Sequence, residues 1–256
     1  MSTGVIFILG KGVTPILAYG VKSTWPQGSS APGFSTTSGI GHFLWKYYVS
    51  SGHNVIVTGR RKELLDDMAR SFPEHTHTVL CDIIQTELFD NSLEEIIHKY
   101  CQIDLAIVCA GIGDLNPNLE VETELSTLSV NVIGWANAVA SIYNLFERQK
   151  SGHLVTITSV GGLQPTPIAP SYSASKAFQI NYTKSLQCKA KGTDIIVTEI
   201  RPGLVDTRMA KGNGLFWVMP LEKVCRRIVK AIEKKQQKLI VTRRWRIINF
   251  ALKHLM

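Results

Sequence analysis

The sequence predicts an α/β fold, a single doubly wound domain in which a parallel sheet lies between two layers of helices. Three observations support it. Short β-branched runs alternate with longer helical patterns along the chain, which is the rhythm of parallel strands joined by helical crossovers. The run 105–109 is almost entirely apolar, as in a strand covered on both faces. The 256 residues contain neither an internal repeat nor a linker, so we expect one domain spanning 1–256.

The individual elements follow from these patterns. Strands are predicted at 5–9, 54–58, 77–81, 105–109, 153–158, 194–200 and 238–242. Helices are predicted at 41–52, 62–71, 92–100, 122–147, 173–190 and 221–234. In a sheet of this kind, ligands bind outside the carboxyl ends of the strands. We therefore look for function in the residues that follow each strand.

Composition narrows the class of protein. Hydrophobic residues make up 45% of the chain and charged residues 19%, as in an ordinary folded domain. No apolar run reaches the roughly 18 residues of a membrane span, and we expect a cytoplasmic protein. The five cysteines form no CxxC pair, so we expect buried, reduced thiols and no metal site. The net charge of +8 suits an anionic partner, but no zinc-finger or RNA-binding motif favours nucleic acid.

Four strand ends carry residues that suit a ligand groove. They are Gly59-Arg60-Arg61, Cys81-Asp82, Cys109-Ala110-Gly111 and Arg201-Pro202-Gly203. Small residues let a ligand approach the backbone, and the arginines supply positive charge. Together the four ends outline a groove across one edge of the sheet.

Ser159, Tyr172 and Lys176 carry the candidate chemistry. Tyr172 and Lys176 are four residues apart at the start of a helix, so they share one face. A nearby ammonium favours the phenolate and should lower the tyrosine pKa from its usual value of about 10, which suits a general acid and base. Ser159 follows a strand and can reach the same substrate oxygen. The alternative is an ordinary Tyr–Lys pair on a surface helix.

Taken together, these motifs resemble the short-chain dehydrogenase/reductase family. Those in the family's order and spacing are Gly39-Ile40-Gly41, Cys109-Ala110-Gly111, Asn131, Ser159, Tyr172 with Lys176, and Arg201-Pro202-Gly203. The resemblance covers 37–241. It implies a Rossmann-type fold and reversible hydride transfer between a nicotinamide cofactor and a secondary alcohol or ketone.

The same resemblance implies roles for individual residues. Tyr172 would donate and accept the proton, Lys176 would bind the nicotinamide ribose and tune Tyr172, and Ser159 would orient the substrate oxygen. Asn131 would anchor a water that links Lys176 to solvent, and Asp82 would contact the adenine. Further cofactor contacts are expected at Gly10, Ser38, Gly39, Ile40, Gly41, Ala110, Gly111, Pro202, Gly203 and Thr207.

The end of the second strand favours NADP over NAD. An acidic residue there would bind the ribose 2′-hydroxyl and repel a 2′-phosphate. This chain has Gly59 followed by Arg60 and Arg61, and guanidinium groups suit a phosphate. The alternative is that one of the two arginines is simply solvated at a helix start.

The segment 11–36 departs from the family pattern. The family's phosphate turn follows the first strand directly, but here that strand ends at Gly10 and the turn resumes near Gly39. The segment is rich in Gly, Ser and Pro and is interpreted as an insertion, since loops longer than about 12–15 residues are uncommon in compact domains. The alternative function is a nucleotide-sensing or scaffold protein, an altered family member that has lost efficient cofactor binding.

Two further segments carry predictions. The run 209–220 combines apolar residues with glycines and is interpreted either as a hydrophobic lid over an apolar substrate or as the start of a core helix. The segment 243–256 is predicted as a basic amphipathic helix, which would either contact a membrane surface weakly or close an interface or cleft. Apolar residues in the two long helices, among them Ile142, Leu145 and Phe178, predict a homodimer or homotetramer.

Overall fold

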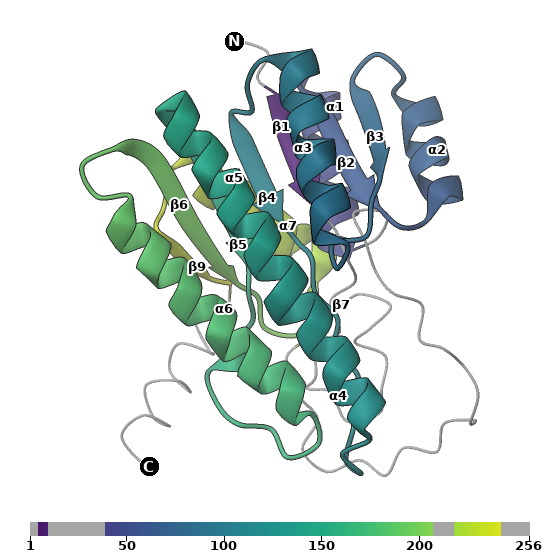
Figure 1. The fold of residues 1–256 in the computed structure, drawn as a ribbon, viewed down its shortest axis with the longest axis vertical. Coiled ribbons are helices and arrows are strands. Elements are labelled where there is room, and N and C mark those ends of the chain that lie inside the picture. The colour runs from purple at the N-terminus through teal and green to yellow at the C-terminus, as the bar shows by residue number, and fades with distance from the viewer. Residues whose placement is uncertain (1–4, 10–38, 207–217, 242–256) are drawn as a thin grey trace.

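The computed structural model describes residues 5–9, 39–206 and 218–241. Seven strands form one parallel sheet in the order β3-β2-β1-β4-β5-β6-β9, with helices on both faces (Figure 1). The strands are β1 (Val5–Leu9), β2 (Asn54–Gly59), β3 (Thr76–Leu80), β4 (Leu105–Val108), β5 (Ser151–Ile157), β6 (Asp194–Arg201) and β9 (Lys238–Ile240). The predicted fold class, a three-layer Rossmann-type domain, is confirmed.

The centre of the sheet is its most apolar part. β1 pairs in parallel with β2 on one side and β4 on the other, so Ile6, Phe7 and Ile8 are covered on both faces and buried. From β1 the chain builds outward to β3 and then returns across β1 to β4. The carboxyl ends of β1 and β4 therefore form the point at which the winding changes direction, where doubly wound sheets bind their ligands.

Three helices cover one face of the sheet. They are α1 (Gly39–Ser50), α2 (Lys62–Ser71) and α7 (Leu221–Glu233), and α7 lies behind the sheet in Figure 1. α1 buries Leu44, Trp45 and Tyr48, which share one side because they are three or four residues apart. The Trp45 indole N–H also donates to Thr76 Oγ1 at 3.0 Å, which ties α1 to the start of β3.

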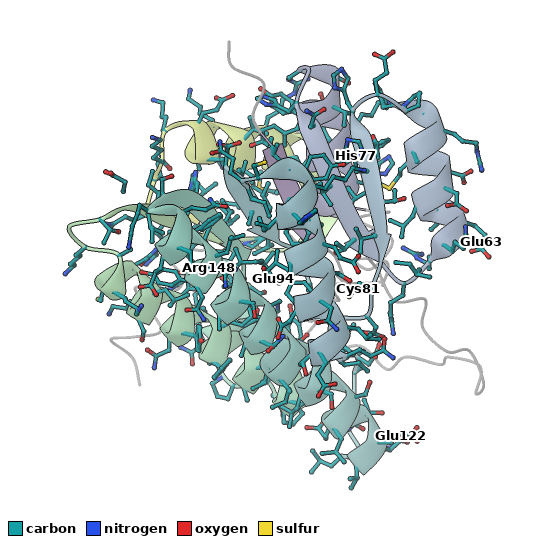
Figure 2. The ribbon with its side chains drawn as sticks, turned by 45° about the horizontal axis from the view of Figure 1, so that its top comes forward. Glu63, His77, Cys81, Glu94, Glu122 and Arg148 are labelled. Atoms are coloured by element: carbon teal, nitrogen blue, oxygen red, sulfur yellow. The ribbon has the colours of Figure 1, made fainter. Side chains whose placement is uncertain are left out.

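The other face is covered by α3 (Thr86–Tyr100), α5 (Trp135–Gln149) and α6 (Pro170–Lys189), which lie side by side in Figure 1. The first part of the α5 run consists of α4 (Val121–Leu128) and a π-helical turn, η1 (Ser129–Gly134). An ion pair at 2.7 Å between Arg148 and Glu94 links α5 to α3, and Figure 2 labels both residues.

The predicted helix 122–147 is a continuous helical run of 29 residues, Val121–Gln149, that includes the π-helical turn. By length and composition alone it could span a bilayer. Trp135, Ile142 and Phe146 are nevertheless buried in the cluster that covers the sheet. The run is a core helix of this domain.

Some predicted boundaries are wrong. The helix predicted at 92–100 begins six residues earlier, at Thr86, because Phe89 shares the buried face of Leu93 and Ile96. A short 3-10 turn, η2 (Val160–Gly162), and the two-residue strands β7 (Val205–Asp206) and β8 (Met219–Pro220) were not predicted. β7 and β8 pair in parallel, and Met219 packs against the core, so this end of the 209–220 segment belongs to the body of the domain.

Several predictions lie outside the described residues. These are Gly10, Ser38 and Thr207, the 11–36 insertion, the 209–217 part of the predicted lid, and the 243–256 segment. All five cysteines are described and none forms a disulfide. Cys109 and Cys225 are buried as predicted, but Cys101 and Cys188 are exposed because they lie at or near the ends of α3 and α6.

Candidate active site

Tyr172 lies in the first turn of α6, beside the carboxyl end of β5. Pro170 begins the helix, and the Ser171 amide donates to Glu124 Oε2 at 3.0 Å, which attaches this end of α6 to α4. The Tyr172 side chain is only 1% exposed. Among the described residues no partner meets hydrogen-bond geometry at its hydroxyl, although the Ser159 hydroxyl is near enough to affect its pKa. A buried polar atom without a partner is costly, so this hydroxyl is a candidate for contact with a ligand.

Two glycines make room for the Tyr172 ring. A Cβ on Gly113 would lie 2.2 Å from Tyr172 Cδ2, and one on Gly161 would lie 3.1 Å from Tyr172 Cε1. Side chains at these positions would displace the ring. The backbone of the loops after β4 and β5 therefore encloses the tyrosine directly.

Ser159 lies beside Tyr172, as the sequence predicts. It follows β5, and its Oγ accepts the Gly161 amide at 3.0 Å. Because a Cβ on Gly161 would also lie 3.3 Å from Ser159 Oγ, the serine hydroxyl and the tyrosine ring flank the same glycine. The two hydroxyls can therefore approach one substrate oxygen.

Burial dominates the protonation of this pair in the structure. It raises the pKa of Tyr172 to about 12, and the Ser159 hydroxyl acts in the opposite direction. The expected net lowering of the tyrosine pKa is wrong here, because burial outweighs any attraction from the Lys176 ammonium, which lies 5.9 Å from the centre of the ring. Burial also lowers the pKa of Lys176 to about 7, and Cys109 opposes that shift.

Lys176 is fully buried one turn after Tyr172. Its ammonium donates to Gln179 Oε1 at 2.8 Å. Gly111, at the end of β4, lies beside it: a Cβ there would be 3.0 Å from Lys176 Nζ. The absence of a side chain at this position lets the backbone after β4 approach the lysine closely.

Asn131 lies in the π-helical turn and is fully buried. Its side chain receives the Ile112 amide at 2.8 Å and donates to the Ile112 carbonyl at 2.6 Å, so it pairs with the backbone that follows β4. Asn131 Nδ2 also donates to Ser175 Oγ at 3.0 Å. The structure thus brings Asn131, Ser159, Tyr172 and Lys176 together, as the sequence predicts.

The candidate cofactor residues lie along the same edge of the sheet. Gly39, Ile40 and Gly41 form the first turn of α1, where Gly39 has a φ of 59°. Ala110 and Gly111 are buried after β4, and Pro202 and Gly203 are buried after β6. A helix N-terminus beside small residues can bind a pyrophosphate.

The residues predicted to select the cofactor lie after β2 and β3. Arg60 is 43% exposed, and its Nη1 lies 3.4 Å from Asp82 Oδ2. Arg61 precedes the first turn of α2 as its N-cap and is half-buried. The two strand ends are adjacent because β2 pairs with β3. Positive charge is thus placed at the end of β2, where the sequence predicts the ribose.

Sequence reasoning missed Gly113, Ser175 and Gln179. A signal for the last two is present in α6, where the polar or ionisable residues at 172, 176, 179 and 183 are spaced by three or four, 175 lies beside 176, and all five are buried. A polar stripe of this kind on a core helix indicates a buried hydrogen-bond network. Nothing in the sequence distinguishes Gly113 from an ordinary loop glycine.

The fold and the site define an oxidoreductase of the short-chain dehydrogenase class. The model of the family described as short chain dehydrogenase matches residues 35–215, and the chain belongs to that family.

Individual proteins that are similar to this chain include other oxidoreductases. The chain is 29% identical over 179 residues to an uncharacterized oxidoreductase of Staphylococcus epidermidis, covering 69% of this chain and 78% of that protein. It is 27% identical over 172 residues to an NADP-dependent 3-hydroxy acid dehydrogenase of Escherichia coli, covering 66% and 69%. The fold is similar to the crystal structure of a short-chain dehydrogenase from Streptomyces avermitilis, with a TM-score of 0.78 at 21% identity over 99% of this chain and 93% of that one.

Proposed function

We propose that the protein is an NADP(H)-dependent oxidoreductase that interconverts a secondary alcohol and a ketone, with Tyr172 as general acid and base. The observation that carries the proposal is the Tyr172 hydroxyl, which is buried and without a partner among the described residues while Ser159 lies beside it. A substrate oxygen between the two hydroxyls would satisfy both.

The proton chemistry follows from this arrangement. In reduction, Ser159 and Tyr172 donate hydrogen bonds to the ketone oxygen, and Tyr172 transfers its proton to that oxygen as negative charge develops. The phenolate that results is stabilised by the Lys176 ammonium one helical turn away. In oxidation the phenolate takes the alcohol proton. The bound nicotinamide supplies or accepts the hydride.

The residues present fit a phosphorylated dinucleotide. The α1 N-terminus at Gly39–Gly41 would bind the pyrophosphate, and Lys176 would bind the nicotinamide ribose. Arg60 and Arg61 would bind the 2′-phosphate, since no acidic residue follows β2 directly. The similarity to an Escherichia coli enzyme that is NADP-dependent also supports NADP.

The surroundings of Tyr172 suit an apolar substrate. Ala169 and Ile168 pack against the tyrosine in a small apolar cluster at the start of α6. Hydrophobic walls with few polar groups are typical of small-molecule sites. We therefore propose a medium-sized apolar ketone or alcohol, which would bring its oxygen to Ser159 and Tyr172 and its carbon skeleton to this cluster.

Replacement of Tyr172 by Phe tests the proposal. The phenyl ring keeps the packing but cannot transfer a proton, so NADPH-linked turnover of an accepted ketone should fall by at least roughly 100-fold. NADPH binding should persist. Tyr182→Phe is a matched control on the same helix, because Tyr182 packs edge-on against Trp135 outside the site, and it should leave turnover unchanged. Wild-type turnover in Tyr172→Phe would overturn the proposal.

A further inference from the structure

Gln179 connects two residues of the candidate site. Its Oε1 accepts from Lys176 Nζ at 2.8 Å, and its Nε2 donates to the Asn131 main-chain carbonyl at 2.9 Å. All three residues are fully buried. The Gln179 amide is therefore a direct bridge between α6 and the π-helical turn.

We propose that Gln179 is a positioning residue, which holds the Lys176 ammonium at the site by anchoring it to the Asn131 carbonyl. The catalytic importance of this role rests on the proposed function. The bridge itself is a property of the folded chain. The lysine is thereby linked to the π-helical turn through a protein side chain, where the family resemblance implies a water molecule.

The orientation of the amide is determined by its partners. A lysine ammonium can only donate, and a main-chain carbonyl can only accept. Gln179 must therefore direct Oε1 to Lys176 and Nε2 to Asn131, and the opposite orientation would lose both bonds. Because the side chain is buried, no solvent competes with either bond.

The π-helical turn gives the Asn131 carbonyl a role outside the helix. In an α-helix the Trp135 amide would donate to the carbonyl four residues earlier, which is that of Asn131. Here the Trp135 amide donates to the carbonyls of Val130 and Val132 instead. π-turns of this kind occur frequently at functional sites. Gln179 Nε2 donates to the Asn131 carbonyl, which does not accept a hydrogen bond from the Trp135 amide.

The side chain of Asn131 holds this turn in place. It pairs with both backbone groups of Ile112 and donates to Ser175 Oγ. The turn is thereby attached to the β4 end and to α6, so its carbonyl is a rigid anchor. Gln179 transmits that rigidity to Lys176, whose aliphatic chain alone would leave the ammonium several rotamers.

Gln179 also favours the charged form of Lys176. An acceptor hydrogen bond stabilises an ammonium, and burial opposes it. The other titratable groups that face Lys176 are Tyr172 on its own helix and Cys109 after β4. Two carboxylates on elements packed against α6 have other partners: Glu124 of α4 accepts the Ser171 amide, and Glu199 of β6 pairs with Arg201. The η1 and η2 segments carry no ionisable side chain.

Titration of Lys176 in the full chain tests the inference without cofactor or turnover. The probe is the ¹³Cε resonance of Lys176 in protein labelled at lysine, assigned as the signal missing from Lys176→Met. In Gln179→Met the apolar side chain keeps the volume but offers no acceptor. The midpoint should fall by roughly one pH unit, the loss expected for a hydrogen bond to a charged group.

Two further variants complete the test. Gln179→Glu places a carboxylate beside the ammonium, so the midpoint should rise. Gln187→Met is the matched control, because Gln187 also lies on α6 and donates to two main-chain carbonyls, those of Val197 and Gln237, away from the site. It should leave the Lys176 midpoint unchanged.

An unchanged midpoint in Gln179→Met overturns the inference. If that variant does not fold, Gln179→Glu decides, and an unchanged or lowered midpoint there overturns it as well. Neither result depends on turnover. Failure of the proposed oxidoreductase function, seen as wild-type turnover in Tyr172→Phe, is therefore distinguishable from failure of the bridge.

Discussion

At the scale of single residues, burial decides the chemistry of the site. Tyr172 and Lys176 are both fully enclosed, so the neutral form of each is favoured: the pKa of the phenol is raised to about 12 and that of the lysine is lowered to about 7. The residue types alone predict the opposite direction for the tyrosine. Sequence identifies the pair by its spacing, but it does not show the 5.9 Å between the ammonium and the ring centre.

The buried lysine predicts a specific pH dependence of stability. Its pKa is about 7 in the folded chain and 10.5 when exposed. Between these values the unfolded chain binds more protons than the native chain, so Lys176 makes the free energy of unfolding rise with pH across that window. The cost of the buried charge is fully present below pH 7 and absent above the exposed value.

Lys176→Met should remove this rise. Urea unfolding of both proteins at several pH values checks it. From about pH 7 to 10 the free energy of unfolding of the wild type, relative to that of the variant, should increase by roughly 1 kcal/mol per pH unit. The comparison cancels the other ionisable groups, which are common to both chains. Parallel curves would show that Lys176 does not titrate in this window.

Sequence predicts which residues form the candidate site but not how they are held. Asn131, Ser159, Tyr172 and Lys176 could be predicted because their spacing carries a family pattern. Gln179 and Gly113 could not, since their roles depend on contacts between segments far apart in the chain. Gly113 and Tyr172 are in contact although they are 59 residues apart in the sequence. Gln179 and Asn131, which are joined by a hydrogen bond, are 48 residues apart.

At the scale of elements, apolar periodicity predicts the strands and most helices. Apolar periodicity misses a helical turn where a polar residue lies on the buried side and forms hydrogen bonds with another element. α3 begins at Thr86, and Asp90 in its second turn accepts from Asn137 Nδ2 and Ser141 Oγ on α5. In the sequence alone, an aspartate at this position is typical of a loop, because its hydrogen-bond donors lie on another helix.

The π-helical turn is a second feature beyond sequence. Its six residues, SVNVIG, have no local signature. Its last residue, Gly134, lies against the backbone after β3, because a Cβ there would be 2.6 Å from the Ile83 carbonyl oxygen. This close approach and the Asn131 contacts are long-range, so they become visible only in the folded chain.

The strand β6 carries a buried ion pair with a measurable role. Arg201 Nη2 donates to Glu199 Oε2 at 2.8 Å and Nε to Oε1, while Thr158 Oγ1 donates to Glu199 at 2.9 Å. The two side chains are 9% and 2% exposed. The charges are paired and bridged to β5, which holds the strand ends that carry Ser159 and Pro202.

Arg201→Met should destabilise the protein by about 3–5 kcal/mol, because it leaves the Glu199 carboxylate buried without its partner. Arg148→Met is the matched control, since the Arg148–Glu94 pair is exposed by 59% and 62%, and it should cost less than about 1 kcal/mol. Urea unfolding measures both. Equal losses in the two variants would contradict the assignment of the β6 pair.

At the scale of the whole molecule, the predicted single domain and its sheet are confirmed. The long helices, however, do not present all of the apolar residues that the interface prediction used. Ile142 and Leu145 were expected to cover a subunit interface, but both are buried in the core of the chain itself. Phe178 is half-buried and stacks near Tyr182. The exposed apolar residues of this face lie earlier, at Leu125 and Ile133 on the α4–η1 run.

We propose that the chain forms a homodimer or homotetramer through this face of α4, η1 and α6. Leu125→Asp combined with Ile133→Asp should then lower the mass in solution, measured by light scattering at micromolar concentration, because charges cannot be buried at an interface without partners. The variants lie outside the core, so the fold should persist. A strictly monomeric mass for the wild-type chain would contradict the prediction.

Calorimetric titration of the full chain with NADPH and then NADH tests the central claim most directly. A Rossmann-type domain that has small residues at its phosphate turn and arginines after β2 should bind NADPH with a micromolar Kd. NADH should bind more weakly, because Arg60 and Arg61 then have no 2′-phosphate to contact. The account predicts that order of affinities. Absence of binding to either nucleotide would contradict it.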